Sequence, residues 1–216
     1  MLRPFLLAVA SALVLGACAS STDVPSSSGT SSAETSVVSP FNLAMQTADE
    51  LVAAGNTPTA IQRLMQLAGD TGISPQQRAD ALYRLGQLSG SPSGYDAEGA
   101  VEYYNEVLAD YANTPAAKQS AAALPGAKSA VAALIAKLES VNSTQADQFL
   151  ALFKLGRHQE AIDVMVANDI LPGNEELLAM SQIGYLCDDS NLTGRAYAVT
   201  DRDGTTRNLR FCDFGK

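Results

Sequence analysis

The chain has 216 residues, of which 46% are hydrophobic, and a formal net charge of −9 from 23 acidic and 14 basic residues. An acidic chain lacks the basic surface on which nucleic-acid binding depends, so we exclude a nucleic-acid partner. The chain has one histidine and three cysteines, so it contains few of the side chains that catalysis and metal binding use most often.

Residues 1–17 have the pattern of an export signal. Arg3 precedes an apolar run from Phe5 to Leu15, which is too short to span a bilayer as a stable helix, and two small residues follow. Removal of this segment leaves 13 of the 14 basic residues beside all 23 acidic ones. No later stretch approaches the ~18–20 uninterrupted apolar residues that a transmembrane helix needs.

The residue that follows the signal is Cys18. The sequence "LGAC" at 15–18 resembles the lipobox of bacterial lipoproteins. In that family the signal is cleaved directly before the cysteine, and the cysteine is acylated. Each buried methylene contributes about 0.8 kcal/mol, so two or three acyl chains give a stable anchor. Ala19 and Ser20 come next, without an acidic residue, and in this family that implies the outer membrane. The resemblance implies a lipid-anchored protein that faces the periplasm; the alternative is an ordinary signal peptide with a chance cysteine.

Residues 18–40 predict a flexible tether behind the lipidated cysteine. They are mostly serine and threonine, with two acidic residues and no basic residue. Such a composition offers no apolar surface to bury, so we expect it to hold the folded part at a distance from the membrane.

Residues 41–186 predict a helical repeat domain, because apolar residues recur at three- and four-residue spacing. Three helix pairs are recognised by their turns. Gly55 and Gly156 are each followed, after four residues, by Ala-Ile, and Tyr95 is followed by Ala100-Val101. Glycine takes the left-handed conformation that ends a helix, and a small alanine lets two helices approach closely. Such pairs bury their apolar faces only by stacking.

These features resemble the tetratricopeptide repeat over residues 41–172. The Leu-Gly pair of the family's first helix is met at Leu85-Gly86, and Tyr104 supplies an aromatic residue four positions after the alanine of the second helix. The stretch "YYNEVLADYANTPAAKQSAA" looks like repeats of outer-membrane lipoproteins from the barrel-assembly and envelope-division machineries. The resemblance implies a mainly α fold, a TPR-like α-solenoid of stacked helical hairpins. The turn and packing positions that it assigns are Gly55, Ala60, Gly86, Ala100, Gly156 and Ala161.

Two further helical segments interrupt and close the repeats. Residues 116–140 predict extra helix, which we expect Pro125 and Gly126 to divide, because proline removes a helical hydrogen bond. The stretch "NEELLAMSQIGYL" after Gly173 predicts a last helix that caps the stack. We expect Cys187 to lie at the end of that helix.

Residues 187–216 predict a small β-hairpin around an Asp-Gly turn. With Cys18 used by lipid, Cys187 and Cys212 remain as a pair in an exported protein, and this favours a disulfide. A bridge closing a loop of this size contributes roughly 3 kcal/mol. The favoured interpretation is a solvated hairpin attached to the stack. The alternative is a docking strand or a basic patch for an anionic envelope component, built from Arg195, Arg202, Arg207, Arg210 and Lys216.

The only histidine, His158, lies in "KLGRHQEAI". Aligned on the turn glycines, it occupies the place of Thr57, so we expect it in an exposed turn where it is replaceable. No phosphate loop, serine elbow or metal motif is present, and "DRDG" lacks the spaced ligands of a calcium loop. The sequence therefore predicts no catalytic residue, no metal and no cofactor.

One acidic stripe is predicted on the second helix of the middle pair. Glu98, Glu102, Glu106 and Asp110 follow at four-residue spacing. Like charges at this spacing slightly destabilise a helix. A solvated face is the favoured interpretation, and a binding face for a basic partner is the alternative.

The sequence as a whole predicts a membrane-anchored periplasmic scaffold for protein interactions, not an enzyme. The resemblance points to cell-envelope assembly or maintenance and leaves the protein partner unidentified. Two alternatives remain. One is an accessory or regulatory subunit of an envelope enzyme that docks through the C-terminal hairpin. The other is a lipoprotein for a soluble ligand, which requires a deep apolar pocket.

Overall fold

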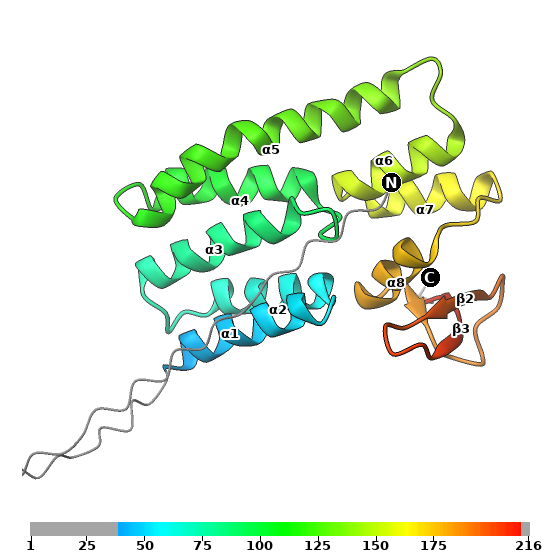
Figure 1. The fold of residues 1–216 in the computed structure, drawn as a ribbon, viewed down its shortest axis with the longest axis horizontal. Coiled ribbons are helices and arrows are strands. Elements are labelled where there is room, and N and C mark those ends of the chain that lie inside the picture. Colours follow the sequence, from blue (N-terminus) through cyan, green and yellow to red (C-terminus); the bar gives the residue numbers. More distant parts are fainter. Residues whose placement is uncertain (1–38, 213–216) are drawn as a thin grey trace, which may run out of the picture. The chain divides into compact units, whose positions relative to one another are not determined.

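The structure, a computed structural model, describes residues 39–212. Within them, eight helices precede a small antiparallel sheet (Figure 1). The helices are α1 (Pro40–Ala53), α2 (Thr57–Gly69), α3 (Pro75–Ser89), α4 (Ala97–Asp110), α5 (Pro115–Glu139), α6 (Gln145–Leu155), α7 (His158–Ala167) and α8 (Asn174–Gln182), and the strands are β1 (Leu186–Cys187), β2 (Tyr197–Thr200) and β3 (Thr206–Phe211). The predicted fold, stacked helices with a small C-terminal hairpin, is confirmed. The predicted signal, Cys18 and the tether up to residue 38 lie outside the described residues.

Three of the helices have a hydroxyl residue at the N-cap and proline as their first residue. Ser39, Ser74 and Thr114 each accept a hydrogen bond from a backbone N–H of the first turn, at 3.2 Å in every case. The proline that follows occupies a position whose N–H has no intrahelical acceptor, so it costs no hydrogen bond. The pair Ser/Thr-Pro thus sets the starts of α1, α3 and α5.

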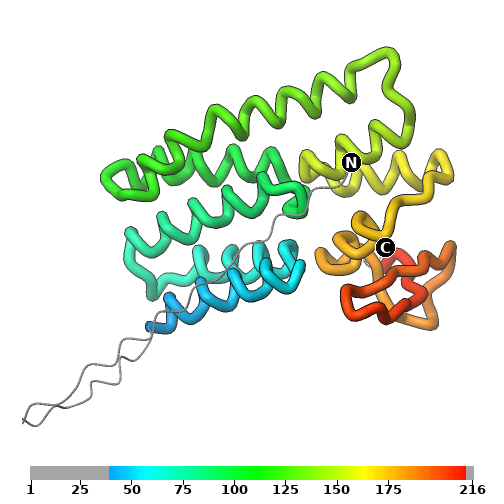
Figure 2. Tube along the Cα trace, in the orientation of Figure 1, coloured from blue at the N-terminus to red at the C-terminus, as the bar shows by residue number. Residues whose placement is uncertain are grey.

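Each helix from α1 to α6 packs against the next one along the chain. Short turns join α1 to α2, α3 to α4 and α6 to α7, which makes three helical hairpins. Helix α5 lies between the second and the third hairpin, and contacts α3, α4 and α6. In Figures 1 and 2, α5 runs alongside α4 and continues beyond it toward α6.

Two hydrophobic cores hold the described residues together. The first core joins α1 to α4 and the start of α5, with Leu64, Leu85 and Val107 fully buried. The second joins α6, α7, α8 and the sheet around Phe153. Tyr95, from the turn between α3 and α4, packs into the second core, so the turn of the middle hairpin joins the two.

Helix α5 is continuous through Pro125, so the expectation that Pro125 and Gly126 divide it is wrong. Proline removes the N–H that would bond to the carbonyl of Ala121. Both Ala121 and Pro125 lie on the exposed side of α5, where water can bond to that carbonyl. Gly126 adds no steric conflict, because a Cβ there would meet nothing within 4 Å.

The tail forms a three-stranded sheet in the order β1-β3-β2. The predicted hairpin is β2 and β3, with Tyr197 opposite Leu209. Strand β1 was not predicted: Cys187 lies in it, opposite Arg210, and not at the end of a helix. The reason is Gly184, whose φ of +91° turns the chain after α8 has ended at Gln182.

Cys187 and Cys212 lie at disulfide-bonding distance, with their Cα atoms 5.0 Å apart. This is the geometry that the predicted pairing requires. The bond attaches the end of β3 to β1, and β1 follows directly from α8. The tail is thus covalently closed onto the segment that packs in the second core.

Candidate functional site

An apolar groove lies between α4 and α5. Val101 of α4 and Val131, Ala132 and Ile135 of α5 form its apolar lining, and the groove encloses about 500 Å³. The α5 residues follow the spacing of one helix face, so they form a ridge parallel to α4. Val101, Val131 and Ile135 are partly exposed, and Ala132 is exposed.

Charged residues border this groove on both sides. Glu98 and Glu102 line it from α4, and Lys128 lines it from α5. Within the described residues, Glu102 and Lys128 form no ion pair. The remaining residues of the predicted stripe, Glu106 and Asp110, are exposed further along α4. The predicted acidic stripe is therefore present on the surface, beside an apolar groove.

Glu98 differs from the rest of the stripe because Arg157 binds it. The guanidinium donates from Nε and Nη2 to the carboxylate, with the closest N–O distance at 2.6 Å. This two-point arrangement suits the planar fork of arginine. It joins the start of α4 to the turn before α7, so Glu98 belongs to the packing between the second and third hairpins.

The turn and packing residues predicted from the repeat pattern lie where close helix approach needs them. Ala60, Ala100 and Ala161 are at most 1% exposed. The ring of Tyr104 lies over Gly86, and a Cβ added to Gly86 would come within 2.5 Å of the ring. The absence of a side chain at Gly86 therefore lets α4 pack closely on α3.

The three aligned turn positions share one backbone conformation. Gly55, Tyr95 and Gly156 have φ values of +78°, +54° and +96°. Left-handed backbone is normal for glycine and unfavourable for tyrosine. The alignment of the three turns from the sequence is thus matched residue by residue, including the position that is not glycine.

The expectation that His158 lies in an exposed turn is wrong. Its Nε2 is 2.8 Å from the carbonyl oxygen of Tyr95. A carbonyl only accepts, so Nε2 holds the proton and donates it. The imidazole also packs against Phe153 and Tyr185, at centroid distances of 5.0 and 5.9 Å. Burial lowers the pKa of His158, opposed by the Tyr95 carbonyl and the nearby Asp96 carboxylate.

Thr57, the residue aligned with His158, has the same role in the first hairpin. It is 3% exposed, and its Oγ1 lies 3.0 Å from Oγ of Ser93 in the turn of the middle hairpin. In both cases the first residue of a second helix reaches the preceding or following turn. A line of polar contacts therefore connects the three turns along one edge of the stack.

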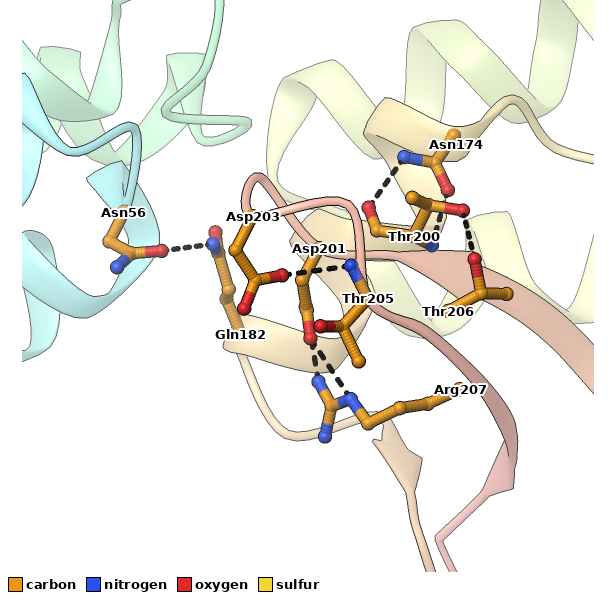
Figure 3. Close-up of polar contacts among 9 residues, drawn as sticks. All are labelled: Asn56, Asn174, Gln182, Thr200, Asp201, Asp203, Thr205, Thr206 and Arg207. Carbon is orange, nitrogen blue, oxygen red and sulfur yellow. Dashed lines mark hydrogen bonds and ion pairs between the residues drawn. The ribbon is translucent and has the colours of Figure 1, made fainter.

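The tail contacts the first of these turns. Gln182 of α8 donates from Nε2 to Oδ1 of Asn56 at 2.5 Å, as Figure 3 shows. Arg202, in the hairpin loop, donates from Nε to the carbonyl oxygen of Gly55 at 3.3 Å. Asn174 exchanges two hydrogen bonds with the backbone of Thr200, which fixes the sheet on α8. The C-terminal hairpin thus docks onto its own first helical hairpin.

A polar cleft of about 390 Å³ lies at this junction. Its charged residues are engaged within the protein: Arg207 donates two hydrogen bonds to Asp201, and Asp203 accepts from the backbone N–H of Thr205 (Figure 3). These bonds hold the "DRDG" loop, in which Gly204 has φ +87°. The described residues contain no group of three or more His, Cys, Asp or Glu side chains placed to hold a metal ion.

Helix α5 has the length and apolar composition of a membrane span, which the sequence analysis did not anticipate. Its most apolar 18-residue window has a mean hydropathy of 1.3 and is 0% buried. Lys118, Lys128 and Lys137 interrupt the apolar run. This helix packs on α3, α4 and α6, so within the described residues it is part of the helical stack.

Sequence reasoning missed the residues that join the hairpins. Arg157 and Gln182 gave no motif, because their partners, Glu98 and Asn56, are 59 and 126 residues away. Tyr95 did give a signal. It occupies an aligned glycine position, and a bulky residue there indicates that tertiary packing compensates for the unfavourable backbone.

Comparison with known proteins finds no family model, curated protein or solved structure that matches this chain.

Proposed function

We propose that this protein is a lipid-anchored scaffold on the periplasmic side of the outer membrane, and that it binds a partner protein through the groove between α4 and α5. The anchor is Cys18, residues 19–38 form the tether up to the N-cap of α1, and the stacked hairpins present the groove. By the repeat resemblance, the process served is envelope assembly or maintenance.

The observation that carries the proposal is the partly exposed apolar lining of the groove. Val131 and Ile135 are aliphatic side chains that line the groove and remain partly exposed. Exposed apolar surface of this kind, bordered by charged residues, is typical of protein interaction sites. The polar cleft at the tail has its charged groups already paired, and thus supports a structural role for the hairpin. We therefore place the partner at the groove and not at the tail.

The anchor is tested by Cys18→Ser in cells. Without the thiol no acyl chain can be attached, and the protein is expected to move from the membrane fraction to the soluble periplasmic fraction. Ser20→Ala is the matched control and is expected to stay in the membrane fraction. Retention of the Cys18→Ser protein in membranes would contradict the anchor.

The binding function is tested by affinity purification from crosslinked envelopes. Val131→Glu puts a charge into the apolar lining and is expected to lose the partner that the unchanged protein retains. Ala133→Glu, on the exposed face of the same helix but outside the groove, is expected to retain it. Equal recovery with both variants would show that the groove is not the binding surface.

A further inference from the structure

The unpaired charges of the α4–α5 groove are one acid and one base, and they come from its two different walls. Glu102 lines the groove from α4 and Lys128 lines it from α5, and both are exposed. Within the described residues neither forms an ion pair. Glu98, the third charged residue of the lining, is bound by Arg157. Apart from that pair the lining is neutral, with the negative charge on one wall and the positive charge on the other.

This pattern of charge is complementary to itself. In an interface with two-fold symmetry the same surface is used twice, so that if residue i contacts residue j, then j contacts i. With the two-fold axis along the groove, the α4 wall of each copy faces the α5 wall of the other. Glu102 of one copy then lies opposite Lys128 of the second copy, and the reverse pair forms as well. One symmetry operation therefore pairs both charges.

The apolar lining fits the same arrangement. Two grooves that face each other bring α4 and α5 of both copies together as four helices, which form a shared core from the aliphatic residues between them. Val101, Val131 and Ile135 are partly exposed and available for that core, and the small side chain of Ala132 permits close approach. None of residues 121–139 of α5 is fully buried, so this part of the helix has free surface for a second copy.

We infer that the occupant of the groove is a second copy of this chain, in a two-fold symmetric dimer in which Glu102 and Lys128 pair between the copies. This inference rests on the proposed function, because it identifies the partner protein that the groove binds.

Other charge patterns in an occupant leave one lining charge unpaired. A basic segment pairs with Glu102 and opposes Lys128, and an acidic segment does the reverse. The net charge of −9 on each copy opposes association, but at physiological ionic strength charges outside the interface are screened over about 8 Å. Two copies anchored in one membrane, as the proposed function has it, also meet at a raised effective concentration.

The first experiment places a photo-crosslinking amino acid at Val131 of the full-length protein in cells, with Ala133 as the matched position outside the groove. The crosslinked segment is identified by mass spectrometry. The expected product at Val131 has twice the mass of the protein and joins two peptides of this chain, and little product is expected at Ala133. A segment of another protein, or lipid, as the main product at Val131 would overturn the inference.

The second experiment measures how well one tagged copy recovers a copy with a different tag. Glu102→Lys sets a lysine opposite Lys128 of the other copy, and Lys128→Glu sets a glutamate opposite Glu102. Each contact occurs twice in the dimer, so each variant is expected to reduce its recovery of itself about tenfold. Recovery that both variants leave unchanged would contradict the pairing of Glu102 with Lys128.

Mixing the two variants is the sharpest test, because only a symmetric pairing predicts its outcome. The Glu102→Lys copy carries lysine at both positions and the Lys128→Glu copy carries glutamate at both. Both contacts between them are therefore attractive, and the mixed pair is expected to be recovered as well as two unchanged copies. A variant that failed to fold could not be rescued in this way. A mixed pair as weak as each variant with itself would overturn the inference.

Failure of the inference is distinguishable from failure of the proposed function. A crosslink from Val131 to another protein, which Val131→Glu abolishes, keeps the groove as a binding surface and overturns only the second copy. A partner retained by Val131→Glu, with no crosslink at Val131, overturns both the groove and its occupant.

Discussion

Tyr95 adopts a backbone conformation that is unfavourable for a non-glycine residue, and its ring makes a packing contact that glycine could not make. Its φ is +54°, and left-handed backbone costs a non-glycine residue roughly 1–2 kcal/mol. In exchange its ring packs on Phe153 at a centroid distance of 4.8 Å. The same turn also supplies the backbone carbonyl that accepts the hydrogen bond of His158, which any residue could provide. The strain at this one residue is thus offset by the packing of the second hairpin on the third.

Gly86→Ala is expected to destabilise the protein by about 1–2 kcal/mol. The added methyl group would collide with the buried ring of Tyr104, and overpacking of this kind typically costs 1–3 kcal/mol. The higher helix propensity of alanine, worth about 1 kcal/mol, offsets part of that cost. Chemical denaturation measures the difference in free energy of unfolding.

Gly126→Ala is the matched control in α5. A Cβ at Gly126 meets nothing within 4 Å, so only the propensity gain applies. This variant is expected to be more stable than the unchanged protein, by up to about 1 kcal/mol. If both glycine variants changed stability in the same direction and by the same amount, the close packing of α4 on α3 would not be the reason for glycine at position 86.

His158→Gln is expected to flatten the pH dependence of stability below neutrality. Burial lowers the pKa of His158 from its ordinary 6.5, so the unfolded chain binds the proton more readily than the folded one. The contribution is therefore fully present above about pH 6.5 and is lost as the pH falls toward the folded pKa. Urea unfolding at pH 7 and pH 5 measures this loss, which glutamine cannot show.

Asp96 provides the necessary comparison for that experiment. Burial is the largest influence on its pKa and raises it, so its contribution to stability has the opposite sign and lies at lower pH. It is present in both proteins, so subtracting their pH profiles gives the effect of His158 together with its interaction with Asp96. The His158 account would be refuted by two profiles that run parallel from pH 7 to pH 5.

At the level of single elements, α5 tolerates Pro125 because of where the proline lies. Pro125→Ala restores an N–H that can bond to the carbonyl of Ala121, and is expected to stabilise the protein by about 1–3 kcal/mol. Pro115→Ala is the control, because Pro115 is at the first position of the same helix, where no N–H is needed. Thermal unfolding is expected to show a higher Tm for the first variant only.

The elements divide into those that local sequence determines and those that distant contacts determine. The three hairpins were predictable, since turn glycines and small residues at fixed spacing specify them. Strand β1 was not, because a two-residue strand exists only through pairing with β3, which is more than twenty residues away. The wrong prediction that Pro125 divides α5 has the same origin. The sequence shows where the proline lies, but it does not show that this side of the helix is exposed to solvent. Similarly, the acidic stripe was predictable, and the groove beside it required the position of α5.

For the molecule as a whole, the contact of Asn56 with Gln182 connects the first helical hairpin to the tail. A double-mutant cycle with Asn56→Ala and Gln182→Ala is expected to give a coupling energy of about 0.5–1.5 kcal/mol. Asn56→Ala with Asn174→Ala is the control pair. Among the described residues, the side-chain hydrogen bonds of Asn174 go to Thr200, and the two effects are expected to add to within about 0.5 kcal/mol. If the coupling energy of the first pair were as small as that of the second, the contact between Asn56 and Gln182 would not stabilise the protein.

That same contact affects the order in which the chain can fold. Residues within a helical hairpin meet after a few tens of positions, whereas Gln182 and Arg202 lie 126 and 147 residues after their partners. Chain segments this distant in sequence close slowly, and they raise the contact order of an otherwise local fold. The first hairpin is synthesised earliest and acquires its final neighbours last. We therefore expect the slowest folding phase to be the arrival of the C-terminal residues at Gly55, a step that cannot begin until synthesis is nearly finished.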